Sequence, residues 1–219
     1  METFFKRATT GVAIILSFLA LFLYLPPIYT SLSLLIIFLI ILFFEWPRIL
    51  GVKNPLFWIL LPFYLMLPFG LMIYMNSIEK YRDLLFYMLI LTFSNDSGGY
   101  FVGKLIGKHK LADMVSPKKT WEGLFGGYIF TCFSIFLILH YTKSDISFLF
   151  IAIFGFAISI SATLGDLFES FLKRKAKIKD SGNILPGHGG LLDRFDSIIY
   201  IVFITFFLKD YLIKIFNPL

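Results

Sequence analysis

Long runs of Phe, Leu and Ile alternate along the chain with shorter polar segments. A helix that crosses a bilayer needs about 20 apolar residues, and somewhat fewer where it packs against protein. The runs that satisfy or approach this length are residues 8–25, 29–44, 55–75, 82–95, 122–140, 147–165 and 191–208. The pattern therefore predicts an all-α, polytopic membrane helix bundle of about seven transmembrane helices.

Two of these spans have features that could change the count. The third carries Pro62 and Pro68, so we expect it to be kinked or split into two short helices. The fourth is short and ends in Ser-Asn-Asp. The first resembles a signal peptide, but no small-residue cleavage site follows it, and we interpret it as a span.

The distribution of basic residues predicts the orientation, because cytoplasmic loops carry an excess of Lys and Arg. With the N-terminus in the cytoplasm, fifteen basic residues lie inside and five outside. The outside residues are Lys80, Arg82, Lys143, Lys209 and Lys214. This count predicts a multi-pass protein of the cell (inner) membrane with a cytoplasmic N-terminus.

Composition agrees with a membrane protein and excludes other classes. The chain is 58% hydrophobic and 16% charged, with a mean hydropathy of +0.83. Its one cysteine, Cys132, excludes a disulfide or a Cys-based metal site within one chain. The net charge of +6 does not indicate nucleic acid, because the basic residues adjoin apolar spans.

Both long polar segments, 96–121 and 166–190, fall on the cytoplasmic side of this topology. They can therefore meet at the membrane surface, where the last span begins. We predict a single integral membrane domain over 1–219, in which 1–95 supplies the N-terminal spans and 96–219 is the catalytic half.

Acidic residues lie where an unpaired carboxylate is costly. Asp166 follows an apolar run directly and shares a helix face with Glu169 and Lys173. An exposed Glu169–Lys173 pair on a cytoplasmic extension of the helix is an alternative, but it leaves Asp166 unexplained. Asp193 and Asp196 stand at the start of the last span, where carboxylates also favour the helix dipole.

Oxygen ligands without Cys suit a hard cation, most plausibly Mg²⁺ held by Asp166, Asp193 and Asp196. Neighbouring cations could then bind phosphate oxygens: Lys173, Arg174, Lys179 and Arg194. The combination points to phosphoryl or nucleotidyl transfer.

Three further motifs have two interpretations each. Ser116-Pro-Lys118-Lys119-Thr120 forms a Pro-started turn that cradles an anion, or only a positive anchor at the membrane. Gly189 and Gly190 let the backbone approach a ligand, or only form a loop. Gly99, Gly103 and Gly107 are first of all a helix-packing stripe. His109 and His188 are more often structural, although His188 could donate to a phosphate.

The C-terminal half resembles the signature of the phosphatidate cytidylyltransferases (CDP-diacylglycerol synthases). The likeness over 170–196 rests on Ser170, Lys173, Arg174, Lys179, Asp180, Pro186, His188, Gly189, Gly190, Asp193, Arg194 and Asp196. Asp96, Tyr100, Gly103, Gly107, Lys108 and residues 116–123 are similar to a second block of that family. The chain is short for the family, and we expect the difference in its N-terminal spans.

This resemblance implies transfer of CMP from CTP to phosphatidic acid at the cytoplasmic membrane interface, with Mg²⁺ as cofactor. It implies catalytic roles for Asp166, Lys173, Arg174, Lys179, Asp180, His188, Asp193 and Arg194. Ser116, Lys118, Lys119, Thr120, Gly189 and Gly190 would bind the substrates. The oligomeric state stays open, with a homodimer as one alternative.

Competing interpretations come from other classes. A CTP-dependent polyprenol kinase shares the Lys-Lys-Thr block but transfers the γ-phosphate. A transporter would place ionisable residues in the middle of several spans, whereas here the acids lie at one surface. A scaffolding membrane protein would leave the charged cluster unexplained.

Overall fold

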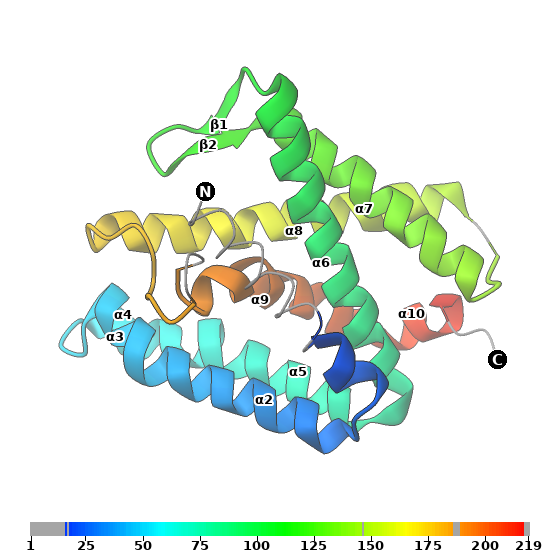
Figure 1. Cartoon of the computed structure of the whole chain (residues 1–219), viewed down its shortest axis with the longest axis horizontal. Coiled ribbons are helices and arrows are strands. Elements are labelled where there is room, and N and C mark those ends of the chain that lie inside the picture. The colour runs from blue at the N-terminus through cyan, green and yellow to red at the C-terminus, as the bar shows by residue number, and fades with distance from the viewer. Residues whose placement is uncertain (1–15, 17, 146, 186–188, 217–219) are drawn as a thin grey trace. The chain divides into compact units, whose positions relative to one another are not determined.

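The computed structural model describes residues 16, 18–145, 147–185 and 189–216, and almost all of its regular structure is helical (Figure 1). The helical segments are α2 (Pro27–Ile40), η1 (Ile41–Glu45), α3 (Trp46–Leu50), α4 (Pro55–Leu60), η2 (Leu61–Met66), α5 (Leu67–Ser77), α6 (Glu79–Ile106), α7 (Trp121–Tyr141), α8 (Phe148–Lys175), α9 (Leu192–Phe207) and α10 (Lys209–Phe216). Two short strands, β1 (Lys110–Ala112) and β2 (Ser116–Thr120), form the sheet. The all-α prediction is confirmed.

Within the described part of the chain, four helical stretches are long and apolar enough to cross a membrane: Pro27–Leu50, Pro55–Ser77, Trp121–Tyr141 and Phe148–Lys175. They correspond to four of the predicted spans and confirm a membrane protein. The predicted spans 82–95 and 191–208 are also helical, within α6 and α9. Of the first predicted span, 8–25, residues 8–15 and 17 lie outside the described part of the chain.

The chain divides into two compact units. Unit 1 consists of Met1–Ile78 and Leu172–Phe195, and unit 2 of Glu79–Phe171 and Asp196–Leu219. The first unit therefore combines the N-terminal helices with the end of α8, the following loop and the first residues of α9. The prediction of a single domain stays a prediction.

In unit 1, the third predicted span is one continuous helical stretch and is not split at its prolines. Pro62 stands at the start of η2, a π-helical segment whose wider turn accommodates the missing backbone donor. Aromatic side chains pack the stretch against α3, because Trp46 stacks on Tyr64 with centroids 5.6 Å apart. The indole N–H of Trp46 also donates to the carbonyl of Phe57.

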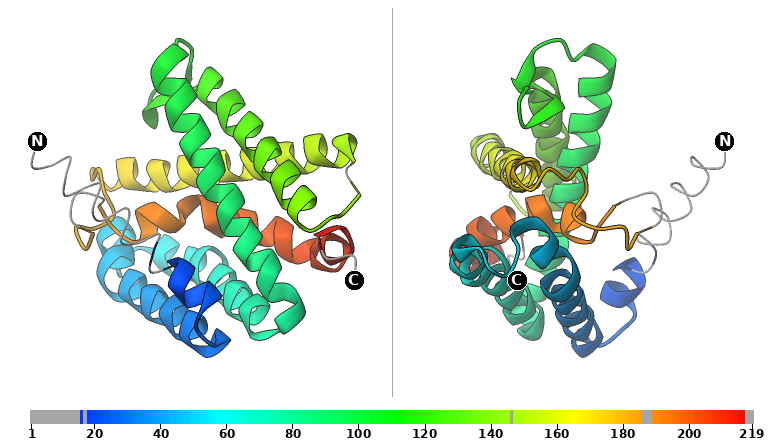
Figure 2. Two further views of the ribbon diagram at one scale, coloured as in Figure 1. Left: turned by 45° about the vertical axis from the view of Figure 1, so that its right-hand side comes forward. Right: turned by 90° about the vertical axis from the view of Figure 1, so that its left-hand side faces the viewer.

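In unit 2, α6 continues to Ile106, well past the Ser-Asn-Asp where we expected the fourth span to end. The reason is close packing against α7, which lies beside α6 in Figure 2. A Cβ on Gly98 would lie 2.6 Å from Phe130, and one on Gly126 would lie 2.4 Å from Val102. The small residues thus hold polar residues of α6 in a helix.

The predicted Pro-started turn at 116–120 is wrong, because these residues form strand β2. β2 pairs antiparallel with β1 in the register Lys110↔Thr120 and Ala112↔Ser116. At its end, the Thr120 hydroxyl accepts a hydrogen bond from the Gly123 amide and caps α7. Pairing with β1 keeps the segment extended, although a Pro at its second position is typical of a turn.

Candidate active site

In unit 1, Asp193 is held at the start of α9 by four donors. Its Oδ1 accepts a hydrogen bond from the Lys173 ammonium at 2.5 Å. Its Oδ2 accepts from the Ser181 amide and hydroxyl, both at 3.0 Å, and from the Gly190 amide at 2.8 Å. The side chains of Asp193 and Lys173 are only 8% and 10% exposed. This carboxylate is therefore fully engaged within the protein.

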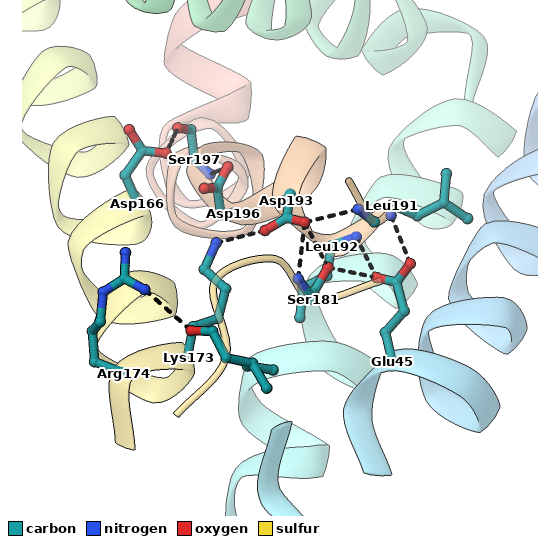
Figure 3. Close-up of polar contacts among 12 residues, drawn as sticks. Glu45, Asp166, Lys173, Arg174, Ser181, Leu191, Leu192, Asp193, Asp196 and Ser197 are labelled. Carbon is teal, nitrogen blue, oxygen red and sulfur yellow. Dashed lines mark hydrogen bonds and ion pairs between the residues drawn. The ribbon is translucent and has the colours of Figure 1, made fainter. Parts of the chain in front are cut away.

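Glu45 forms a second anchor for the same loop (Figure 3). It is the last residue of η1, is buried, and accepts hydrogen bonds from the amides of Leu191 and Leu192 at 2.7 and 2.8 Å. A carboxylate at these amides satisfies orphan donors and suits the positive end of α9. The Ser181 hydroxyl lies 3.0 Å from both Glu45 and Asp193, and its single proton can serve only one of them at a time.

The loop glycines make room for this anchoring. Gly190 packs so closely that a Cβ would lie 2.1 Å from the Ser181 hydroxyl and 2.6 Å from Glu45. Gly189 has a φ of 82°, in the left-handed region that favours glycine. Both glycines thus let the backbone approach carboxylates of the protein, and their predicted contact with a ligand stays a prediction.

The remaining predicted cations of unit 1 are exposed: Arg174, Lys179 and Arg194. Arg174 also donates to the carbonyl of Ile178, which shapes the turn after α8. Asp180 is exposed as well. His188 lies outside the described residues. Their exposure leaves these cations accessible to solvent, and their binding of phosphate oxygens stays a prediction.

In unit 2, Asp166 and Asp196 lie together where α8 and α9 meet. A Cβ on Gly165 would lie 2.3 Å from the Asp196 carbonyl, so only glycine allows this approach. Ser197 connects the two acids, because its hydroxyl donates to Asp166 at 2.8 Å and its amide to Asp196 at 2.9 Å. Lys119 forms an ion pair with Asp166.

Two further acids lie close enough to Asp196 for electrostatic repulsion, namely Glu169 and Asp96. Glu169 is completely buried, so the alternative of an exposed Glu169–Lys173 pair is wrong. Lys173 is buried as well and bonds Asp193, as described above. Several carboxylates thus lie near Asp196, and the repulsion among them favours a bound cation.

The predicted residues of β2 differ in exposure. Lys118 is exposed, and Lys119 is half-buried beside Asp166. Thr120 is buried and caps α7, which gives it a structural role whatever else it binds. Ser116 is half-buried where β2 begins. The structure thus divides this motif into an exposed cation, an ion-paired cation and a helix cap.

Sequence reasoning missed Glu45, the residue with the most evident positioning role. A signal was present, because Glu45 is the first charged residue after Arg7 and directly follows the apolar run Ile-Leu-Phe-Phe. A lone acid at the end of a span is costly unless it is paired. Its partners, however, lie 136 to 147 residues away.

The three predicted metal ligands differ in how free their carboxylate oxygens are to bind an ion. Among the residues described, no three His, Cys, Asp or Glu side chains form a group that could already hold a metal ion. Asp166 and Asp196 offer neighbouring carboxylate oxygens of the kind that Mg²⁺ prefers, and Mg²⁺ completes its shell with water and substrate phosphates. These two residues fit the ion. Asp193, whose oxygens already lie within hydrogen-bonding distance of four donors, fits a positioning role better.

The architecture is that of a membrane-embedded helical protein with carboxylate and lysine groups at its helix ends. Comparison with known proteins gives the family. The model of the cytidylyltransferase family matches residues 3–212, so the chain belongs to that family.

Curated relatives agree with this assignment. The phosphatidate cytidylyltransferase of Rickettsia bellii is 36% identical over 216 residues, which cover 94% of this chain and 90% of that protein. The proteins of the same name from Bacillus subtilis and Haemophilus influenzae are 41% and 38% identical over 61% and 67% of this chain. The matches span 50% and 54% of those two proteins, about half their length.

Proposed function

We propose that the chain is a phosphatidate cytidylyltransferase, which transfers CMP from CTP to phosphatidic acid and releases pyrophosphate. The observation that carries the proposal is the group of Asp166, Asp196 and Lys119 in unit 2, within a chain of the cytidylyltransferase family. Its relatives' names supply the substrates. The expected product is CDP-diacylglycerol.

In this reaction an oxygen of the lipid phosphate attacks the α-phosphorus of CTP. The bond from that phosphorus to the oxygen bridging the β-phosphorus breaks, and pyrophosphate leaves with the bonding electrons. Both reactants are anions, so their charge must be neutralised before they approach. No strong base is needed, because a phosphate monoester is largely ionised at neutral pH.

Within each unit, the candidate residues divide into cations that would bind phosphate and groups that position them. Lys118, Arg174, Lys179 and Arg194 are exposed and would bind phosphate oxygens of the substrates. Lys119 and Lys173 are each held by an aspartate, which fixes their ammonium groups in place. Glu45 and Ser181 hold the loop before α9 and so act through Asp193.

Mg²⁺ is the cofactor that we propose, and Asp166 and Asp196 would hold it. When bound, the ion neutralises the triphosphate and the leaving pyrophosphate. The oxygen chemistry of the two carboxylates and the acids that lie near Asp196 support this assignment.

A labelling experiment tests the reaction against the lipid kinase alternative. Detergent-purified protein is mixed with phosphatidic acid, Mg²⁺ and CTP labelled with ³²P at either the α- or the γ-phosphate, and the lipid phase is extracted. The proposal expects label in lipid from α-labelled CTP alone. Label from γ-labelled CTP would instead identify a kinase, and no label from either would refute the proposed activity.

We also propose that the protein resides in the inner membrane with a cytoplasmic N-terminus, supported by the fifteen-to-five distribution of basic residues. Single cysteines at Lys118 and Lys80, introduced after Cys132→Ser, test the orientation in intact cells with an impermeant maleimide. Only the Lys80→Cys protein should react. A homodimer stays a prediction, which the mass of the purified protein checks.

A further inference from the structure

A groove with a volume of about 490 Å³ lies between α7 and α8, wholly within unit 2. Its lining is almost entirely apolar and includes Trp121, Leu124, Phe125, Tyr128, Ala152 and Ser159. Figure 2 shows that the two helices are inclined to each other. We name this space the α7–α8 groove.

The groove has two distinct ends. The helices pack tightly near Gly155, where a Cβ would lie 2.7 Å from Cys132. Just before that point, the Tyr128 hydroxyl donates to the Ala152 carbonyl at 3.3 Å and closes the deep end. Because the two helices are antiparallel, the other end lies at Trp121 and the later residues of α8.

The surroundings of the groove are hydrocarbon, because α7 and α8 are both long and apolar enough to cross the membrane. Phe125, Ile153 and Phe156 on its walls are about 60% exposed. From Trp121 to Tyr128 the groove extends about 10 Å along α7, at about 1.5 Å per residue. That is roughly two thirds of the depth of one leaflet, which is about 15 Å. An acyl chain of a lipid matches this length and chemistry.

One buried hydroxyl interrupts the apolar lining. The Ser159 side chain is only 1% exposed, and its hydroxyl has no hydrogen-bond partner among the residues described. A buried hydroxyl without a partner is costly, and a serine in a helix usually finds one in the preceding turn. Ser159 lies toward the Trp121 end of the groove, where an ester carbonyl of a lipid could accept its proton.

The charge next to that end complements a lipid phosphate. Lys118 is exposed and stands three residues before Trp121 in the chain. Tryptophan itself favours the boundary between hydrocarbon and headgroups. In the chain the cation thus precedes the interfacial ring, which lines the groove together with the Ser159 hydroxyl and apolar side chains. A lipid has the matching order of phosphate, glycerol, ester and acyl chain.

We infer that the α7–α8 groove binds one acyl chain of the phosphatidate substrate, with an ester carbonyl at Ser159 and the phosphate toward Lys118. The inference rests on the proposed function for the identity of the lipid. It makes the groove a determinant of acyl-chain length, and Ser159 a residue that recognises an ester linkage.

Filling the deep end of the groove tests whether the groove determines the length of acyl chain that binds. Ala152→Phe places a ring there, and Ala157→Phe is the matched control on the same helix, outside the lining. KM is measured for dioleoyl and for dihexanoyl phosphatidate. Ala152→Phe should raise KM for the long lipid about tenfold, the loss that about two buried methylene groups would cause, and leave the short lipid unchanged. Equal effects on both lipids would overturn the inference.

A separate experiment tests the proposed hydrogen bond from Ser159 to an ester carbonyl. Ser159→Ala should raise KM for diacyl phosphatidate about fivefold, as expected for a neutral hydrogen bond, and leave the dialkyl ether analogue unchanged. If Ser159 had a purely structural role, Ser159→Ala would change KM equally for both lipids. Equal shifts in KM would therefore refute the assignment of Ser159.

A binding experiment without CTP separates this inference from the proposed reaction. Phosphatidate with a diazirine in the middle of one chain is photolysed with the protein, and the labelled peptides are identified. Label in α7 and α8 that is lost in Ala152→Phe and kept in Ala157→Phe supports the groove even if no CMP transfer occurs. Activity with label elsewhere, or a change of oligomeric mass in Ala152→Phe that indicates a second copy in the groove, would overturn it.

Discussion

The Glu45 carboxylate accepts the backbone amide of Leu192 at 2.8 Å, although 147 residues separate the two in the chain. The contact fixes the first turn of α9 against η1, and the same carboxylate also accepts the amide of Leu191. The N-terminal helices of unit 1 therefore hold the loop that precedes α9. They position part of the charged motif and are not only a membrane anchor.

Removing the Glu45 carboxylate should destabilise this arrangement. Glu45→Ala leaves the amides of Leu191 and Leu192 buried without an acceptor, at a cost of about 2–4 kcal/mol. We expect a lower melting temperature in detergent and weaker CMP transfer. Glu79→Ala, at an exposed glutamate at the start of α6, is the control and should melt like the wild type. Equal melting of both variants would contradict the anchoring role.

A methyl group at Gly190 should have a similar effect by a different cause. Its Cβ would lie 2.1 Å from the Ser181 hydroxyl and 2.6 Å from the backbone nitrogen of Gly182. Overpacking of this kind costs about 1–3 kcal/mol. Gly70→Ala in α5 is the matched control, because nothing lies within 4 Å of the added carbon. Thermal unfolding should show a loss only in Gly190→Ala.

The buried pair of Lys173 and Asp193 should behave as a unit. Either alanine variant removes one partner of a buried ion pair, which costs about 3–5 kcal/mol, and the double variant should cost less than the sum of the two. A double-mutant cycle on unfolding in detergent measures this coupling. Lys175→Ala, at an exposed position two residues along, should be neutral. Strictly additive losses would mean that the pair contributes nothing.

The surface carboxylate of Asp210 leads to a prediction of how stability depends on pH. The pKa of Asp210 lies below its ordinary value, because the Tyr81 hydroxyl donates to it at 2.6 Å and Lys209 and Lys80 lie nearby. Stabilisation from this bond is present above the ordinary carboxyl pKa of about 3.9 and is lost as the pH falls through the lower folded value.

Tyr81→Phe removes that bond. Its melting temperature should fall below that of the wild type at pH 6, and the difference should shrink as the pH falls toward about 2. Tyr24→Phe, at an exposed tyrosine, should show no difference at either pH. A constant gap between Tyr81→Phe and the wild type across this range would exclude the carboxylate as the partner that matters.

The local sequence pattern predicted most of the helices and the charged motif. The remaining features depend on contacts between residues that are distant in the chain. Apolar run length predicted α7 and α8 because a span must satisfy its own backbone. The same criterion predicted too early an end for the fourth span. Packing at Gly98 and Gly126 supports the continuation of α6, and only the folded chain reveals that packing. The role of Glu45 was hidden for the same reason.

For the charged residues, too, the sequence predicted one part and contacts in the folded chain determine the other. Their types and spacing predicted a site for phosphate and metal, and the structure brings Asp166 and Asp196 together in unit 2. Spacing could not tell which carboxylates are already occupied. Only the hydrogen bonds show that Asp193 is engaged by Lys173, Ser181 and Gly190, and this changes its expected role.

That difference in role leads to the most discriminating prediction. Binding of Mn²⁺, used as a paramagnetic substitute for Mg²⁺, can be followed by electron paramagnetic resonance without any turnover. Asp166→Asn and Asp196→Asn should each weaken Mn²⁺ binding about 10- to 100-fold, because each removes a charged oxygen ligand. Asp193→Asn should leave Mn²⁺ affinity unchanged and still abolish CMP transfer, because it releases Lys173 and the loop before α9. Asp210→Asn, at the surface, should alter neither. A loss of Mn²⁺ affinity in Asp193→Asn as large as in Asp166→Asn would show that all three carboxylates bind the metal, and that the hydrogen bonds of Asp193 give way when the ion enters.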